Sequence, residues 1–352
     1  MRVLVTGATG IVGSNLVRRL LQESNEVRVL VRPTSDARGL DKLDVERHEG
    51  DVLQPSSLDA AFRGCDILYH AAAVFSYSLD AEEQEAIAIR GTRNALQAAH
   101  RAGVSRIVLT SSSVVLGSSA TPTVLDEAAP VEQPVDVAYV TSKARQESAA
   151  FDMAAELGLE LVAVCPTLVI GSFDYRLGPS TATIVNYLND PFRSTFLGGC
   201  NFVSARDVAA GHVIAAVRGT AGCRYIVGSE NLTWRDAHKA ISELAGTFGP
   251  SIVLNHTAAY LAAAASEAAA RLGGRVPPVT RAEAQMSARF YWYSHARIGD
   301  LGYCPTPARE AIAEAIAWAL HRSYVTDAVA RRLDLSREVL EVQARLTKET
   351  HA

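Results

Sequence analysis

Runs of Val, Ile and Leu alternate with helical segments through the first half of the chain. Five apolar runs, at 2–7, 26–32, 65–73, 105–113 and 159–171, are separated by stretches with the 3.6-residue periodicity of helices. Such runs are typical of strands buried on both faces, as in parallel sheets flanked by helices. The alternation therefore predicts a doubly wound α/β fold, in which ligands bind beyond the carboxyl ends of the strands.

Three glycines, Gly7, Gly10 and Gly13, lie between the first predicted strand and the first predicted helix. They allow a tight turn and a close approach of the backbone to a pyrophosphate, which the free N–H groups of the helix N-terminus bind. The spacing is one residue longer than the usual dinucleotide fingerprint, and a plain structural turn is the alternative. The position at a strand-to-helix junction favours a cofactor. The predicted contacts at this junction are Thr6, Gly7, Thr9, Gly10, Ile11, Val12 and Gly13.

The end of the second apolar run indicates which dinucleotide binds. Enzymes that use NAD carry a carboxylate there for the ribose 2′-OH, whereas this chain has Arg32 and no carboxylate before Asp36. A guanidinium can form a bidentate contact with a 2′-phosphate, so we predict NADP(H) as the cofactor. NAD(H) stays possible if Asp36 turns back to the ribose.

Two further segments fit the rest of a dinucleotide. Asp51 follows the next strand position and could accept a hydrogen bond from the adenine amino group, while Val52 packs on the ring. Ala71, Ala72 and Ala73 end the run at 65–73, and their small side chains allow the cofactor to cross the sheet edge closely. Either feature alone is more often structural.

Composition excludes several classes of protein. A formal net charge of -4 over 352 residues gives no broad basic field, so nucleic acid is not expected as a partner. The most apolar helical stretch, 258–272, is interrupted by Ser266 and Glu267, so we expect a soluble, cytoplasmic protein that binds no membrane. The dispersed histidines and cysteines form no metal motif, and we expect reduced thiols. The five cysteines are Cys65, Cys165, Cys200, Cys223 and Cys304.

Tyr139 and Lys143 lie four residues apart in a predicted helix that can begin at Asp136 and end at Gly158. Both side chains therefore point the same way, although such pairs also occur by chance on amphipathic helices. The run at 105–113 ends in three serines. Because neighbouring strand ends and the helix after them face one crevice, Ser112 is expected within reach of Tyr139.

The motifs TGATGIVG, GDVLQP, HAAA, TSSSVVLG, YVTSK and CPTLVIGS stand in the order found in extended short-chain dehydrogenase/reductases. The chain resembles that family, part of the NAD-dependent epimerase/dehydratase superfamily, over about residues 1–320. GGCNFVSARDVAAGH, RYIVGSENLT and IGDLGYCPTP make it most similar to the dihydroflavonol-4-reductase-like branch, which includes bacterial proteins described as hopanoid-associated sugar epimerases.

The resemblance implies roles for the three polar residues. Tyr139 would be the general acid toward a carbonyl oxygen, Ser112 would orient that oxygen, and Lys143 would lower the tyrosine pKa and hold the nicotinamide ribose. A homodimer is implied as well. The resemblance also implies cofactor contacts from Thr110, Tyr139, Lys143, Pro166, Thr167 and Leu168.

The chain departs from the family pattern at three places, of which the first puts an Asn-dependent proton relay in doubt and the other two favour simple carbonyl reduction. Ala88 stands where an Asn is common, Leu116 stands where sugar epimerases often have Tyr, and Ser113-Val114 stand where dehydratases have Asp-Glu. Our first hypothesis is NADPH-dependent reduction of a ketone or aldehyde to an alcohol. The alternatives are an epimerase that recycles its cofactor on a nucleotide or lipid-linked sugar, and a sensor that binds NADP without turnover.

Substrate preference and domain limits are less strongly marked. Aromatic residues in loops near the crevice either form an apolar pocket or pack the smaller region, and because these loops have few charges we expect an apolar or aromatic carbonyl substrate. These residues are Phe75, Tyr77, Phe173, Tyr175, Phe192 and Phe196. We expect a Rossmann-type NAD(P)-binding domain at 1–170, to which 201–228 return, and we predict a helix over 201–219. A smaller C-terminal substrate-binding α/β region would comprise 171–200, an irregular wall, and 229–320, followed by a helical tail at 321–352.

Overall fold

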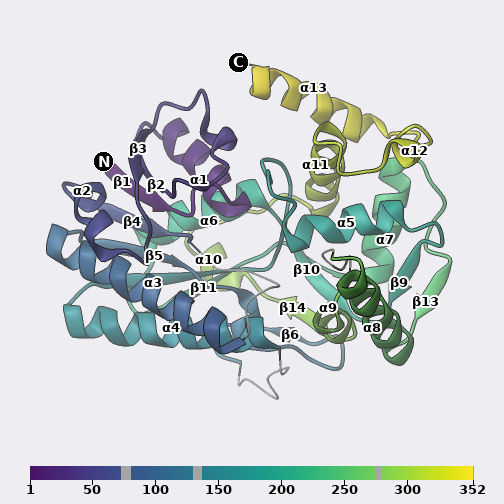
Figure 1. The fold of residues 1–352 in the computed structure, drawn as a ribbon, viewed down its shortest axis with the longest axis horizontal. Coiled ribbons are helices and arrows are strands. Elements are labelled where there is room, and N and C mark those ends of the chain that lie inside the picture. The colour runs from purple at the N-terminus through teal and green to yellow at the C-terminus, as the bar shows by residue number, and fades with distance from the viewer. Residues whose placement is uncertain (73–80, 130–136, 275–276, 278, 352) are drawn as a thin grey trace.

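A computed structural model describes residues 1–72, 81–129, 137–274, 277 and 279–351 of the chain. Ala73, Phe75, Tyr77 and Asp136 lie outside these residues. Figure 1 shows a large sheet with its helices beside a second, mostly helical part.

The large sheet confirms the predicted doubly wound fold. Its seven strands lie in the order β11-β7-β5-β4-β1-β2-β3, and every neighbouring pair is parallel. Helices cover both faces, since Val3 and Val5 pack toward α1 and α6 whereas Leu4 packs toward α2 and α3. The strands are β1 (Arg2–Thr6), β2 (Glu26–Val31), β3 (Glu46–Glu49), β4 (Ile67–His70), β5 (Arg106–Thr110), β7 (Glu160–Pro166) and β11 (Arg224–Val227).

The helices of this sheet form two layers. Helix α1 packs against α6 on one face, and α3 packs against α4 on the other, as Figure 1 shows. The α-helices are α1 (Ile11–Gln22), α2 (Asp59–Phe62), α3 (Ala81–Ala102), α4 (Ala138–Leu157) and α6 (Ala205–Arg218), and short 3₁₀ turns lie at Arg38–Leu40, Pro55–Ser57 and Ser113–Leu116. Helix α4 ends at Gly158, as predicted, in the left-handed conformation with φ of 66°.

The second part contains smaller sheets. One has the order β12-β10-β14-β6 with β8 paired to β10, and a separate pair joins β13 to β9. The chain crosses between the two parts repeatedly, after β7, β10, β11 and β14. The strands are β6 (Val124–Leu125), β8 (Leu168–Ile170), β9 (Ser194–Phe196), β10 (Gly199–Ser204), β12 (Glu230–Thr233), β13 (Ile252–Leu254) and β14 (Phe290–Tyr293).

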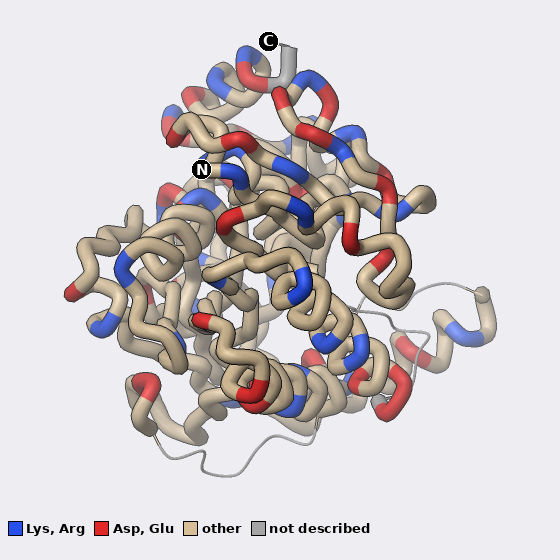
Figure 2. Tube along the Cα trace, turned by 90° about the vertical axis from the view of Figure 1, so that its left-hand side faces the viewer, with Lys and Arg blue, Asp and Glu red and all other residues tan. Residues whose placement is uncertain are grey.

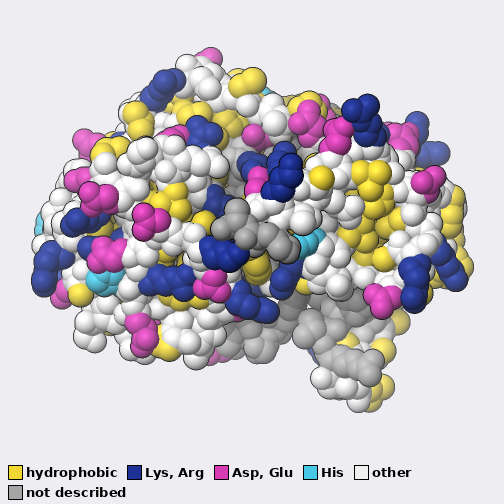
Figure 3. Space-filling model, turned by 90° about the horizontal axis from the view of Figure 1, so that it is seen from above, with side chains coloured by type: hydrophobic (Ala, Val, Ile, Leu, Met, Phe, Trp, Pro, Cys, Tyr) yellow, Lys and Arg dark blue, Asp and Glu magenta, His cyan; other side chains and the backbone are white. Residues whose placement is uncertain are grey.

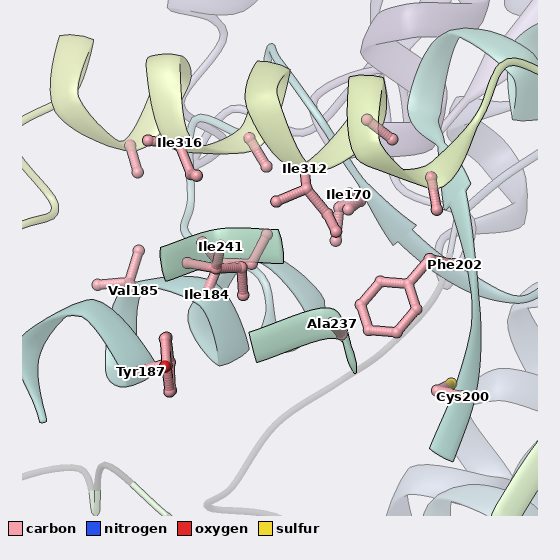
Figure 4. Close-up of a cluster of buried hydrophobic side chains, with 14 of the residues drawn as sticks. Ile170, Ile184, Val185, Tyr187, Cys200, Phe202, Ala237, Ile241, Ile312 and Ile316 are labelled. Atoms are coloured by element: carbon pink, nitrogen blue, oxygen red, sulfur yellow. The ribbon is translucent and has the colours of Figure 1, made fainter. Parts of the chain in front are cut away.

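The core of the second part lies between three helices. Figure 4 shows Ile184 from α5, Ile241 from α7 and Ile312 and Ile316 from α11 gathered in one apolar cluster, and all four are buried. The helices of this part are α5 (Pro179–Asn189), α7 (Trp234–Ala245), α8 (His256–Leu272), α9 (Arg281–Ser287), α10 (Ala296–Gly299), α11 (Ala308–His321), α12 (Asp327–Ala330) and α13 (Arg337–His351).

The structure corrects two expectations about these segments. Residues 172–200, predicted to be irregular, contain α5 and β9, because α5 gains stability from burying Ile184 and Leu188 rather than from intrinsic propensity. Residues 201–204, predicted as the start of a helix, are strand β10, and the helix α6 begins at Ala205. Within 201–228, β10 lies in the second sheet, whereas α6 and β11 belong to the large sheet and its layers.

The charged tail is an ordered helix. Val339 and Leu346 of α13 are buried, and the helix packs against α11. Arg206 of α6 also bonds Glu314 of α11 at 2.7 Å and Glu349 of α13 at 2.9 Å. These contacts tie the tail to both parts of the molecule.

Charges of both signs are spread over the molecule. Figure 2 shows acidic and basic residues following one another along the trace, and Figure 3 shows them interspersed among hydrophobic side chains on the face seen from above. None of the described helices has the length and apolar character needed to cross a membrane.

Candidate active site

A cavity of about 1840 Å³ extends from the glycine loop, past the carboxyl ends of the central strands, to α8 and α9. Apart from Ala73, every predicted site residue lines it, although these residues come from distant parts of the chain. The residues are Thr6, Gly7, Thr9, Gly10, Ile11, Val12, Gly13, Arg32, Asp51, Val52, Ala71, Ala72, Thr110, Ser112, Tyr139, Lys143, Pro166, Thr167 and Leu168.

The three loop glycines differ in whether the fold itself requires a glycine at that position. Gly7 has a φ of +71°, and a Cβ there would lie 2.5 Å from the Ala71 carbonyl carbon. A Cβ on Gly13 would overlap the Gly7 carbonyl oxygen, so packing of helix on strand requires glycine there. A Cβ on Gly10 would meet no protein atom closer than 3.6 Å, and the φ of -87° suits any residue. Of these three positions, Gly10 is therefore the one at which the fold itself does not require a glycine.

The start of α1 fits an anionic ligand. Gly10 is the N-cap residue, no side chain caps the helix, and its first turn has no acidic residue. The N–H groups at this end and the partial positive charge of the helix dipole are therefore available to a phosphate. Together with the open space at Gly10, the loop fits the pyrophosphate of a dinucleotide.

Two arginines line the cavity beside the glycine loop. Arg32 lines it at the end of β2, and Arg176, from the segment between β8 and α5, lines it and donates to Thr9 Oγ1. Burial and the Arg32 charge lower the pKa of Arg176. Asp36 is bound to Arg38, with oxygens 2.9 Å and 2.6 Å from the guanidinium, and this contact lowers the Asp36 pKa to about 2.

Arg176 was not identified from the sequence. It lies in the segment expected to be an irregular wall, and no motif connects that segment with the glycine loop. Asp51, in contrast, lines the cavity as predicted, and its Oδ1 accepts a hydrogen bond from Leu53 N–H at 2.9 Å.

The three serines after β5 face different partners. Ser112 hydrogen-bonds to the side chain of Tyr139, whereas Ser111 lies at the Cys165 thiol and Ser113 at the Tyr293 hydroxyl. Only Ser112 is thus directed at the tyrosine in the cavity.

Burial governs the ionisation of the tyrosine and the lysine. It raises the pKa of Tyr139, and the hydrogen bond from Ser112 opposes that rise only in part. Lys143 is not among the groups that shift this pKa in the protein alone, so the lowering expected from Lys143 together with the charged nicotinamide of the oxidised cofactor stays a prediction. Burial also lowers the pKa of Lys143 to about 8, against the attraction of Glu147.

A chain of buried hydrogen bonds connects the lysine with the glycine loop. Lys143 Nζ donates to Gln146 Oε1 at 3.1 Å, and Gln146 Nε2 donates to Thr92 Oγ1 at 2.8 Å. His70 then bridges Thr92 Oγ1, at 3.3 Å, and Thr6 Oγ1, at 2.8 Å. Burial lowers the pKa of His70 to about 4, so the ring is neutral at pH 7 and has a structural place in this chain.

The predicted aromatic pocket is mostly wrong. Phe173 is buried against Trp318, with ring centroids 5.3 Å apart, and Tyr175 packs on the same indole. Phe192 is exposed to solvent, and Phe196 alone of the four described aromatic residues lines the cavity. Other rings, described below, take that place.

All five cysteines are free thiols. Over the residues that the structure describes, no group of three His, Cys, Asp or Glu side chains could hold a metal ion.

Comparison with known proteins identifies the family. The sequence profile of the NAD dependent epimerase/dehydratase family matches residues 3–228. The chain is 34% identical to a Synechocystis sp. protein provisionally named dihydroflavonol 4-reductase, over 91% of this chain and 95% of that protein. It is 33% identical to sterol demethylase protein B of Methylococcus capsulatus, over 92% of this chain and all of that protein (100%).

A rice protein and a solved structure are also similar to this chain over most of its length. Cinnamoyl-CoA reductase 1 of Oryza sativa subsp. japonica is 31% identical, over 89% of each chain. The crystal structure of gox2253 superimposes with a TM-score of 0.81 at 35% identity and covers 92% of this chain and 99% of that chain. The chain therefore belongs to the NAD dependent epimerase/dehydratase family, the extended short-chain dehydrogenase/reductases, whose members are NAD(P)-dependent enzymes.

Proposed function

We propose that this protein reduces a ketone or aldehyde to an alcohol with NADPH. The observation that carries the proposal is the contact of Ser112 with Tyr139, beside buried Lys143, in a cavity continuous with the glycine loop. The reductase names of relatives from Synechocystis and rice support the same reaction class.

Each residue has a defined task in this reaction. NADPH, when bound, supplies the hydride that reduces the carbonyl carbon. Tyr139 donates its proton to the carbonyl oxygen, and its raised pKa keeps that proton in place at neutral pH. Ser112 holds the same oxygen by a hydrogen bond. Lys143, charged below about pH 8, stabilises the phenolate left after proton transfer.

The two arginines support NADPH over NADH. Arg32 and Arg176 bring two positive charges to one end of the cavity, which is favourable when a dianionic 2′-phosphate lies between them. Asp36, the residue that could have served NAD, is engaged with Arg38. The Thr9 hydroxyl, which accepts from Arg176, completes the set of polar groups proposed for this phosphate.

The test is NADPH oxidation with a panel of aromatic, polycyclic and sugar ketones, followed by absorbance. We expect turnover by the wild type, and a loss of 100-fold or more in Tyr139→Phe, as removal of a general acid costs about 10²–10⁴. Ser112→Ala should lose activity while Ser113→Ala, its matched neighbour, should keep most of it. Tight binding of NADPH without consumption on any ketone would contradict the proposal and favour an epimerase or a sensor.

A further inference from the structure

Besides Ser112, Tyr139 and Lys143, the cavity is lined by side chains of α5, β9, α7 and α8. We call this part of the cavity the outer chamber, and one side of it is an aromatic wall. The wall consists of Tyr187 from α5, Phe196 from β9, and Trp234 and His238 from α7, all of which line the cavity. Tyr187 and His238 stack with ring centroids 4.1 Å apart and an interplanar angle of 5°. Phe196 meets Trp234 edge-on at 6.3 Å. The wall therefore presents ring surfaces suited to apolar, ring-containing molecules.

Helix α8 gives the chamber a second apolar side. Ala259, Ala263 and Ala270 are buried residues that line the cavity at helical spacing, and their small side chains leave room for a bulky ligand. Ala259 and Ala263 also pack with Phe196, so α8 adjoins the aromatic wall. The chamber is continuous with the proposed cofactor site, and the whole cavity has a volume of about 1840 Å³.

The charged groups of the outer chamber are mostly engaged with each other or with the backbone. Asp190 accepts from the backbone N–H of Ser194 at 2.6 Å, and Glu267 pairs with Arg281 at 2.8 Å. Arg271 lines the chamber as an exposed side chain close to Glu267. A sugar diphosphate, which needs clustered cations, is therefore less suited to the chamber than an uncharged ring compound.

One polar atom stands out on the aromatic wall. His238 Nδ1 is bonded to Thr195 Oγ1 at 2.9 Å, and both side chains are buried. Among the described residues no group hydrogen-bonds to His238 Nε2. Burial lowers the pKa of His238 to about 3, so the ring is neutral, and Nε2 either donates or accepts according to the tautomer. A hydroxyl suits both tautomers, because it can accept or donate.

We propose that the outer chamber binds the far end of the substrate, an apolar ring that bears a hydroxyl, by stacking on the aromatic wall and hydrogen bonding to His238 Nε2. This inference rests on the proposed function, since it places the reacting carbonyl of the same molecule at Ser112 and Tyr139. His238 is then a substrate-binding residue that selects for a polar group distant from the carbonyl.

The test is binding without turnover. The dissociation constants of two matched ketone pairs are measured by calorimetry with NADP⁺ present: flavanone and 4′-hydroxyflavanone, and 5α-androstan-3-one and its 17β-hydroxy derivative. We expect at least one hydroxylated ketone to bind the wild type roughly 3- to 10-fold more tightly than its partner. His238→Phe, which keeps an aromatic ring, should abolish this preference and leave binding of the unhydroxylated ketone within about twofold.

The outcomes separate this inference from the reductase proposal. Measurements on the wild type alone can overturn the inference. They do so if the two ketones of each pair bind with equal affinity, or if none of the four ketones binds. Tighter binding of UDP-glucose than of every ring ketone would also overturn it. If the preference is found but NADPH is not consumed, the chamber stands and the reductase proposal fails.

Discussion

Burial of Lys143 affects stability as well as chemistry. The side chain is only 6% exposed, and its pKa is lowered from 10.5 to about 8. Below pH 8 the folded protein must hold a desolvated charge that the unfolded chain holds in water. Between pH 8 and 10.5 the unfolded state binds more protons than the folded state, so this residue's contribution to stability rises with pH.

The first prediction follows from this increase of stability with pH. Relative to Lys143→Met, whose side chain does not titrate, the wild type should gain about 2.5 kcal/mol in free energy of unfolding between pH 7 and pH 10. Urea unfolding of both proteins at the two pH values measures the difference. A constant difference would mean that Lys143 titrates as it does in the unfolded chain.

Individual residues were predictable from sequence only where a motif names them. Ser112, Tyr139 and Lys143 follow from motif order, and all three line the cavity. Gln146 and Arg176 carry no such mark, because their partners, Thr92 and Thr9, lie 54 and 167 positions away along the chain. Contacts of this kind depend on the tertiary fold, which local patterns do not encode.

The junction of β1 and α1 allows a matched test of the glycine loop. Gly10→Ala should change the free energy of unfolding by less than about 1 kcal/mol, because its Cβ meets no atom within 3.6 Å, yet weaken NADPH binding at least tenfold. Gly13→Ala should cost about 1–3 kcal/mol, since its Cβ meets backbone. Urea unfolding and NADPH fluorescence titration measure the two effects. Normal NADPH affinity in Gly10→Ala would exclude a phosphate at that position.

Helix α13 provides a second element-scale prediction. Leu346 is 1% exposed against the core that includes α11, whereas Leu340, on the same helix, is 50% exposed. Leu346→Ala should lower the free energy of unfolding by about 2–5 kcal/mol, and Leu340→Ala by less than about 0.5 kcal/mol. Equal small effects in urea unfolding would show that the helix is not docked in solution.

Elements with continuous apolar patterns were the predictable ones. The central strands β1, β4, β5 and β7 are buried on both faces, so each carries a strong local signal, whereas the edge strand β3 is polar and mostly exposed. Helix α5 has β-branched residues at Thr181, Thr183, Ile184 and Val185, which weaken local helical propensity, and packing against α7 and α11 compensates. Strand β10 is followed directly by α6, so its short apolar pattern cannot be distinguished in the sequence from the start of the helical pattern.

The proposed 2′-phosphate site joins the two parts of the molecule, since Arg32 follows β2 of the large sheet and Arg176 lies in the segment leading into α5. Arg176→Ala should weaken NADPH binding about 10- to 100-fold, and leave NADH binding nearly unchanged, because a charge-assisted hydrogen bond is worth about 1.5–3 kcal/mol. Arg176→Lys should recover part of the affinity. Fluorescence titration with both cofactors measures this selectivity, and an equal loss for NADPH and NADH would place Arg176 away from the 2′-phosphate.

The repeated crossing of the chain between its two parts has a consequence for biosynthesis. Six of the seven large-sheet strands have been synthesised once Pro166 is made, but the last, β11, ends 61 residues later at Val227. At about 5–20 residues per second, the backbone N–H and C=O groups on this edge of β7 lack their β11 partner for several seconds. An open edge of this kind recruits other strands. Nascent chains are therefore most vulnerable to aggregation during this interval, and chaperones that shield strand edges would act there.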